Sequence, residues 1–399
     1  MFILSTCFNL VLWFFLLVPN AFATELEVQD IISLNEIAQF ENPKLIGSKH
    51  LDEYALFKQR ESLGALLPQV NIETSRSYTE YESNTSQFDY YGSRSSLVAS
   101  QAILNLPAWY NYDRHKSLTQ KTNFQSHTTR LEQTQNLVKR YLDVLLAENT
   151  LRVTKVEIET VEQNLSRITS LYQKQLATVT DLLKAQSRLD SLKADALSQT
   201  ASIDVARESL AELVGKYGHA PLANLKLESS LVPLIPVSDF SFVHESALKD
   251  NPSVKMFESN IEAERLAYKA AQSQHAPKIT LRLASQASNI GYDNIQTNDT
   301  DSNSATLLLQ VPIYAGGSTS AASNAAKQNM LIAKEDLKFL KRQITKETRA
   351  AYQKLKVAQL QIKASDTALK SAISVKNAAE KSFKYGLVNN VDILQSIQN

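Results

Sequence analysis

Hydrophobic residues recur with a period of two in four segments of the chain. In the second half the apolar positions are Ile279, Leu281 and Leu283, followed by Ala305, Leu307, Leu309, Val311 and Ile313. In the first half they are Val70 and Ile72, followed by Val98, Ala102 and Leu104. This period predicts four β-strands, each with one apolar and one more polar face. Such faces suit a strand that separates lipid from water, and they equally suit the half-buried strand of a soluble sheet.

Polar stretches separate the two strands of each pair and predict solvent-exposed loops at 79–88 and 289–303. Aromatic residues gather near the predicted strand ends: Tyr78, Tyr81, Tyr90, Tyr91, Trp109, Tyr292 and Tyr314. This distribution is typical of an aromatic girdle at a membrane interface, although aromatic residues also favour strands in general.

The remaining segments show the 3–4 spacing of long helices. No glycine or proline follows Gly317 before Lys384, so a single helix there would extend for roughly 100 Å. Apolar and small residues form three seams of the coiled-coil type: Ile158, Val161, Leu165, Ile168 and Tyr172; Leu182, Ala185, Leu189, Leu192, Ala196, Gln199, Ile203, Ala206, Leu210 and Leu213; and Leu355, Ala358, Ile362, Ser365, Leu369 and Ala372. The other faces are polar, which argues against a membrane-spanning helix.

The chain is an internal duplication. Asn42-Pro43 recurs 209 residues later as Asn251-Pro252, and the same offset relates LLPQVNI to HAPKITL. Asp181 and Asp392 match at an offset of 211. Matches in the same order at a nearly constant offset indicate two copies of one unit. Each copy is predicted to run helix, strand, strand, long helix, helix.

We therefore divide the chain into a signal peptide (1–23), a first repeat (24–220), a linker (221–241) and a second repeat (242–399). Asn399 aligns with Arg188 of the first repeat. We accordingly expect the second repeat to be truncated at its C-terminus, without the final helix that corresponds to 189–215.

The N-terminus has the pattern of an export signal. Residues 2–18 are mostly apolar and precede Ala21-Phe22-Ala23, so cleavage is expected before Thr24; the alternative is an uncleaved anchor helix. Cys7, the one cysteine, lies in this segment. The mature chain therefore has no cysteine for a disulfide, a metal site or a nucleophile.

The composition offers no signal for catalysis or nucleic-acid binding. The net charge is +1, from 42 basic and 41 acidic residues, which gives no electrostatic basis for binding nucleic acid. The histidines show no i, i+4 pair, and the nucleophile-elbow, zinc-protease and phosphate-loop motifs are absent. We predict no enzyme activity, no catalytic residue, no cofactor and no metal site.

The ordered motifs resemble the TolC-type outer membrane efflux protein family. The resembling segments are ENPKL and DNPSV, LLPQVNI and HAPKITL, LQVPIYAGG, and the tips LYQKQLATVTDLLKAQ and FKYGLVNNVDILQSIQ. The resemblance implies a mainly α fold with transmembrane β-strands, in a homotrimer. Each protomer would give four strands to a twelve-stranded β-barrel and its long helical hairpins to an α-barrel. It also implies a location in the bacterial outer membrane, extending into the periplasm.

By the same resemblance, the protein is expected to be the exit duct of a tripartite efflux or type I secretion system that passively conducts small molecules or proteins outward. Its expected partners are a periplasmic adaptor (membrane fusion protein), an inner-membrane ABC or resistance-nodulation-division pump, and outer-membrane lipid. The alternative is a periplasmic coiled-coil structural protein without a pore, which would have no use for four strands in duplicated positions.

The resemblance places adaptor docking at the two helical tips. We expect Leu176 and Asp181 to serve in the first copy, and Gly386 and Leu387 in the second. Gln175 stands where glycine is usual at the first tip, which predicts altered turn geometry there.

The family's best-known periplasmic entrance is closed at the second tip by a Tyr, an Arg and two Asp. Here Asp392 keeps the first Asp position, Phe383 replaces the Tyr, and Gln395 replaces the second Asp. The resemblance therefore implies a ring of Asp392 carboxylates at the entrance, without the salt-bridge lock. The alternative role of Asp392 is to cap the helix that follows the turn.

Overall fold

The computed structural model describes residues 28–223, 239–290 and 296–384. The predicted signal peptide, most of the predicted linker and the second helical tip lie outside these residues. The chain divides into two compact units, Met1–Asn42 with Leu137–Leu225, and Pro43–Asn136 with Lys226–Asn399. Helix α3 (Leu106–Gln173) contributes to both units. The boundaries of these units differ from those of the predicted repeats, which stay a prediction.

In the first unit, α1 (Ile31–Glu41), the C-terminal part of α3 and α4 (Val179–Val214) share a hydrophobic core. Its buried members are Leu34, Ala38, Leu137, Tyr141, Val144, Leu145, Leu210, Leu213 and Val214. After α4 a short 3-10 helix, Gly215–His219, folds back against α4. Residue 218 has to be glycine, because a Cβ there would lie 2.5 Å from the backbone nitrogen of Ala211.

Farther along this unit, α3 and α4 pair along two of the predicted seams, which are confirmed. The buried seam residues include Val161 and Ile168 on α3, and Ala185, Leu189 and Leu192 on α4. Ion pairs flank the seam, with Arg188 Nη2 2.6 Å from Glu157 and Lys193 Nζ 3.0 Å from Glu162. These pairs are partly exposed, so the apolar seam supplies most of the stability of the hairpin.

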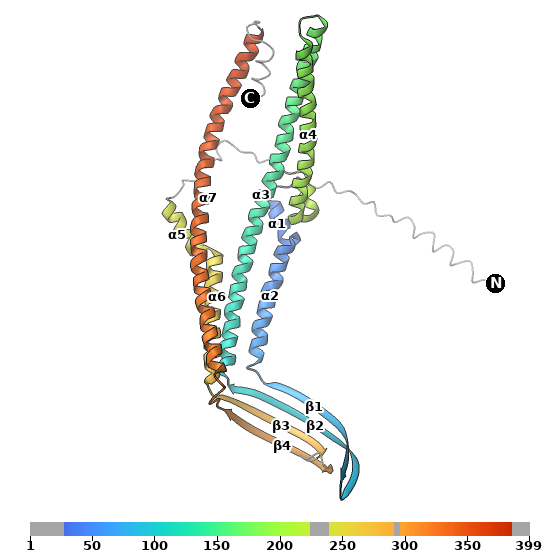
Figure 1. Ribbon diagram of the computed structural model, residues 1–399, viewed down its shortest axis with the longest axis vertical. Coiled ribbons are helices and arrows are strands. Elements are labelled where there is room, and N and C mark those ends of the chain that lie inside the picture. The colour runs from blue at the N-terminus through green and yellow to red at the C-terminus, as the bar shows by residue number, and fades with distance from the viewer. Residues whose placement is uncertain (1–27, 224–238, 291–295, 385–399) are drawn as a thin grey trace, which may run out of the picture. The chain divides into compact units, whose positions relative to one another are not determined.

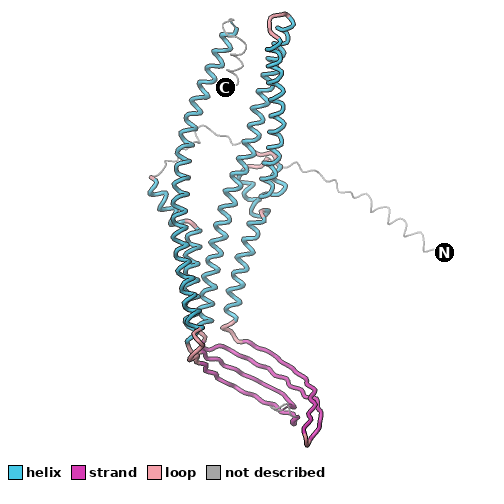
Figure 2. Tube along the Cα trace, viewed as in Figure 1, coloured by secondary structure: helices cyan, strands magenta, loops and turns pink. Residues whose placement is uncertain are grey.

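The second unit contains one antiparallel sheet with the strand order β1-β2-β3-β4. The strands are β1 (Gln69–Ser83), β2 (Ser86–Leu104), β3 (Lys278–Ile290) and β4 (Gln296–Gln310). Figures 1 and 2 show them side by side. Each predicted repeat supplies one hairpin, and the hairpins join through β2 and β3. The four predicted strands are confirmed, and β1 and β4 form the two edges.

The prediction of long solvent loops between the paired strands is wrong. β1 continues to Ser83 and β2 starts at Ser86, so the turn consists of Asn84 and Thr85. β4 starts at Gln296, within the stretch predicted as the second loop. Polar residues can extend these strands because the antiparallel partner satisfies the backbone of each strand. The polar composition of these stretches therefore did not indicate where the paired strands end.

The four long helical segments of this unit follow the same order as the strands. The hydroxyl of Thr119 on α3 donates to the carbonyl of Ala55 on α2 (Pro43–Gly64) at 3.2 Å. On its other side α3 contacts α6 (Pro252–Gln272), where Lys121 Nζ lies 3.0 Å from Asn260 Oδ1. Helix α6 in turn packs against α7 (Ser318–Lys384).

Each Asn-Pro pair joins an 11-residue helix to a longer one. Asn42 links α1 to α2, and Asn251 links α5 (Phe240–Asp250) to α6. Both asparagines have extended backbones, with ψ of 115° and 121°, as expected before proline. The prolines then fit the first helical turn, as predicted. The helices α1 and α5, which precede the pairs, were not part of the prediction.

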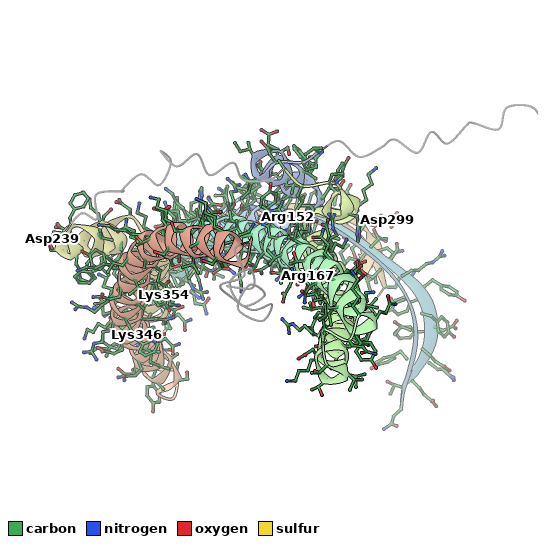
Figure 3. The ribbon with its side chains drawn as sticks, turned by 90° about the horizontal axis from the view of Figure 1, so that it is seen from above. Arg152, Arg167, Asp239, Asp299, Lys346 and Lys354 are labelled. Carbon is green, nitrogen blue, oxygen red and sulfur yellow. The ribbon has the colours of Figure 1, made fainter. Side chains whose placement is uncertain are left out.

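Helix α7 is a single helix of 67 residues, as predicted from the absence of glycine and proline. Its predicted seam is exposed, however: Leu355, Ile362 and Leu369 are 40%, 51% and 59% accessible. Charged side chains such as Lys346 and Lys354 also extend from this helix into solvent (Figure 3). Within the described residues, no helix packs on this seam.

None of the described helices contains an apolar stretch suited to crossing a membrane.

Candidate functional site: the sheet faces and the helical tip

The register of the sheet assigns each strand residue to one of two faces. Leu281 pairs with Gln101 and with Leu307, so these three side chains share a face. We call this the apolar face: Val70, Ile72, Leu97, Ala99, Leu104, Ile279, Leu281, Leu283, Ala305, Leu307 and Leu309 lie on it. The opposite side, the polar face, carries Ser75, Ser77, Arg94, Ser96, Arg282, Gln286, Ser302, Ser304 and Thr306.

The apolar face of β3 and β4 agrees with the sequence prediction, but part of the assignment in β2 was wrong. Val98 pairs with Asn71 and lies on the polar face, whereas its neighbours Leu97 and Ala99 lie on the apolar face. Three consecutive apolar residues left the alternation ambiguous. A shift of register between Ala102 and Leu104 then brings Leu104 opposite Ile279, because a bulge reverses which positions face each side.

Large side chains on the apolar face are exposed in the single chain. Ile72, Leu307 and Leu309 are 79%, 67% and 61% accessible. Exposed apolar surface that is contiguous over several strands marks a contact with lipid or with another protein. Val311 and Ile313, which the alternation pattern included, lie beyond the end of β4.

Aromatic residues pair across the far end of the β1–β2 hairpin. The ring centroids of Tyr78 and Tyr91 are 5.2 Å apart on the apolar face, and those of Tyr81 and Phe88 are 4.9 Å apart on the polar face. Such cross-strand pairs stabilise a two-stranded ribbon. Among the predicted girdle residues, Trp109 and Tyr314 are exposed and Tyr292 lies outside the described residues. A membrane-interface role stays a prediction.

The tip between α3 and α4 is a compact turn despite the absence of glycine (Figure 2). The backbone nitrogens of Gln175 and Leu176 donate to the carbonyls of Tyr172 and Leu171, at 2.9 and 2.8 Å. This is the pattern of a Schellman motif, in which one residue adopts a left-handed conformation. Gln175 does so with φ of 63°, the one non-glycine residue with positive φ in the described part of the chain.

Asp181 caps the start of α4 at this tip. Its carboxylate accepts from the hydroxyl of Thr178 at 2.6 Å, and its backbone nitrogen donates to that hydroxyl at 3.2 Å. Hydrogen bonds from the Thr178 hydroxyl and backbone N–H lower the pKa of Asp181. The first-copy aspartate therefore has a structural role, while Leu176, Val179 and Leu183 expose apolar side chains around it.

The predicted entrance lies at the edge of what the structure describes. Asp392 and Gln395 lie outside the described residues, as do Gly386 and Leu387 of the second tip. Phe383 belongs to the last turn of α7. The entrance ring and the second docking tip thus stay predictions.

A groove of about 570 Å³ between α2 and α3 was not foreseen from the sequence. Lys58, Glu61, His115 and Lys121 line it. Burial and the positive charge of Arg114 lower the pKa of His115, and Glu61 opposes this shift. No group of His, Cys, Asp or Glu suited to holding a metal ion is found among the residues that the structure describes.

Comparisons with known proteins agree with this architecture. The profile of the family described as outer membrane efflux protein matches residues 243–398. The outer membrane protein TolC of Escherichia coli is 23% identical over 391 residues, which covers 94% of this chain and 78% of TolC. The alkaline protease secretion protein AprF of Pseudomonas aeruginosa is 24% identical over 361 residues, covering 87% of this chain and 74% of AprF. The Campylobacter jejuni CmeC outer membrane channel has a TM-score of 0.79 at 17% identity, over 92% of this chain and 79% of CmeC.

The alignments with TolC and AprF span both predicted repeats, whereas the match to the family model lies within the second. The structural match covers 92% of the chain. The expected fold class, long helical hairpins with four strands per chain, is confirmed. Residues 243–398 thus match the outer membrane efflux protein family, and the chain as a whole is similar to TolC and AprF in sequence and to outer membrane channels in fold.

Proposed function

We propose that this protein is an outer-membrane channel that extends into the periplasm and forms the exit duct of an efflux or type I secretion system. The observation that carries this proposal is an open four-stranded sheet with two unpaired edges and one exposed apolar face. Long helical hairpins accompany that sheet in the same chain. A coiled-coil structural protein would need the hairpins but not the sheet.

The edges of the sheet support assembly as a homotrimer. β1 and β4 are long strands with one unpaired side each within the described residues. Backbone N–H and C=O groups cannot stay unpaired in lipid, so each edge needs a partner strand. Pairing β4 of one protomer with β1 of the next, three times, would close a sheet of twelve strands. The apolar face would then contact outer-membrane lipid, and the polar face would line an aqueous conduit.

The relatives support transport rather than catalysis. TolC is an outer membrane protein, AprF is a protein of alkaline protease secretion, and CmeC is an outer membrane channel. By analogy we propose that the channel conducts small molecules or proteins passively, while an inner-membrane ABC or resistance-nodulation-division pump supplies the energy for transport. A periplasmic adaptor would connect pump and channel.

The first helical tip is the surface that we propose for the adaptor. Leu176 is 72% exposed at the turn, and Val179 and Leu183 expose apolar side chains on the following helix. The Schellman turn and the Asp181 cap hold these side chains in a fixed arrangement. Leu176→Ser should therefore weaken adaptor capture without altering trimer yield, whereas loss of both would point to a folding defect.

Cross-linking tests the trimer directly, because the mature chain has no cysteine. Cysteines introduced in pairs, one within 71–75 on β1 and one within 301–305 on β4, should yield covalent dimers and trimers in isolated outer membranes. A matched pair with the first cysteine moved to Leu97 on the central strand β2 should yield none. A monodisperse monomer with full strand content in detergent would contradict the proposal.

Planar-bilayer recordings then test conduction by the purified trimer. We expect stable ion-conducting steps that require no nucleotide. A trimer without conductance under any condition would favour the non-pore structural protein instead.

A further inference from the structure

The charged residues of the sheet are sorted by face. On the polar face, Arg94 pairs with Ser75 and Ser288, Arg282 pairs with Ser100 and Thr306, and Lys278 pairs with Gln310. Among the described strand residues, one carboxylate shares that face, Glu73, which pairs with Ser96. The polar face thus carries three cationic side chains and one anionic side chain per protomer.

The apolar face carries more negative than positive side chains, at positions outside its apolar residues. Strand alternation places one cation there, Arg76, together with five carboxylates: Glu80, Glu82, Asp89, Asp299 and Asp301. The sheet as a whole is therefore acidic, and the positive polar face arises from the register and not from the composition.

The cations on the polar face lie at different levels along the strands. Arg282 lies opposite Ser100, six residues along β2 from Arg94, a separation of about 20 Å along the strand. Glu73 lies two residue pairs from Arg94, at the next pair on the same face, so it offsets part of the charge there. Arg282 is exposed, its cross-strand neighbours are uncharged, and it forms no ion pair with a described residue. The excess positive charge is therefore concentrated at Arg282 and the nearby Lys278.

We propose that the polar face of this sheet favours anionic over cationic solutes, so that the conduit is anion-preferring where it crosses the sheet. This inference rests on the proposed function, because the closed trimer brings three copies of Arg282 around one aqueous path. Rings of Arg or Lys are a recognised basis of anion preference in pores. Three arginine charges, each about 10 Å from a solute in this path and screened by salt, raise the local concentration of an anion about twofold relative to a neutral solute.

The test measures the reversal potential of single trimers in planar bilayers across a tenfold KCl gradient. Arg282→Gln removes the charge and keeps a polar side chain of similar length. Its chloride-to-potassium permeability ratio should fall by at least about twofold relative to the unsubstituted protein. Arg76→Gln makes the same chemical change on the opposite face and should leave the ratio unchanged. Equal shifts in both variants, or no shift in Arg282→Gln, would overturn the assignment.

A second measurement separates a charge effect from a folding effect. Arg282→Cys can be labelled after assembly, since no other thiol is present in the mature chain. A cationic methanethiosulfonate reagent should restore the permeability ratio, and an anionic reagent should lower it further. Labels of opposite charge with the same effect would overturn the inference. If no trimer conducts, the unsubstituted protein included, the proposed function fails, and the inference fails with it.

Discussion

Gly92 of β2 lies against the side chain of Ile290 of β3, just beyond the last residue pair of the two hairpins, Arg94 with Ser288. A Cβ at position 92 would be 2.4 Å from Ile290 Cδ1 and 2.7 Å from its Cγ1. Ile290 is buried, and next to this contact Asn289 Oδ1 accepts from the backbone nitrogen of Ser93 at 2.7 Å. The absence of a side chain at residue 92 thus lets β3 close against β2 at this end.

The first prediction follows from that contact. Gly92→Ala should destabilise the sheet by about 1–3 kcal/mol, because a buried isoleucine has to move. The double variant Gly92→Ala with Ile290→Ala should lose less than the sum of the losses in the two single variants, since the smaller residue at 290 makes room for the new methyl group. The measurement is the urea midpoint of the folded protein in detergent. Additive losses in the double variant would show that the two residues are not coupled.

The second prediction concerns the two faces of β4. Leu307→Arg should lower the trimer yield in outer-membrane fractions, because a charge on a lipid-facing strand position costs about 2–4 kcal/mol near the membrane midplane. Thr306→Arg, one residue away on the polar face, should be tolerated. Equal yields for the two variants would contradict the assignment of the faces.

The third prediction concerns Gln175. A left-handed residue other than glycine or asparagine is strained by about 1 kcal/mol, so Gln175→Gly should stabilise the tip turn. Hydrogen exchange at the amides of Leu176 and Lys174 should slow. Lys174→Gly, next to the left-handed position, serves as the control and should speed exchange. Faster exchange in Gln175→Gly would mean that the glutamine side chain stabilises the turn in another way.

The fourth prediction is a pH dependence at the same tip. Hydrogen bonds from Thr178 hold the pKa of Asp181 below its usual value, so its carboxylate stabilises the folded tip above about pH 4. That contribution should be lost as the pH falls through the lowered pKa, because the unfolded tip binds the proton more readily. The protection factors of the tip amides, which are exchange rates corrected for the intrinsic rate at each pH, should therefore fall in acid. In Asp181→Asn this acid-dependent part should disappear.

Much of the architecture followed from local patterns in the chain. The Asn-Pro pairs set the starts of α2 and α6, since proline fits a first helical turn and restricts the residue before it. The unbroken stretch after Gly317 predicted α7 correctly. The seams of α3 and α4 were also recognisable, because a 3–4 spacing has one structural solution along a helix.

Other features were decided by tertiary contacts. The polar stretches around Tyr81 and Asp301 are strands because antiparallel partners form hydrogen bonds with their backbone groups. Side-chain composition does not indicate that pairing. The bulge near Leu104 determines which β2 residues lie on the apolar face, since the register of a strand depends on its neighbour. Helix α1 folds into the first unit through Leu34 and Ala38, which meet α3 and α4 residues more than 90 positions away.

The candidate site shows the same division. The four amphipathic strands and the long coiled-coil hairpins could be predicted from the sequence, because both depend on local spacing and residue type. That Arg282 and Arg94 share a face while Arg76 lies on the other could be known only from the pairing of the strands. That outcome depends on the alignment of four strands, two from each half of the chain, and a shift of one residue between them would reverse it.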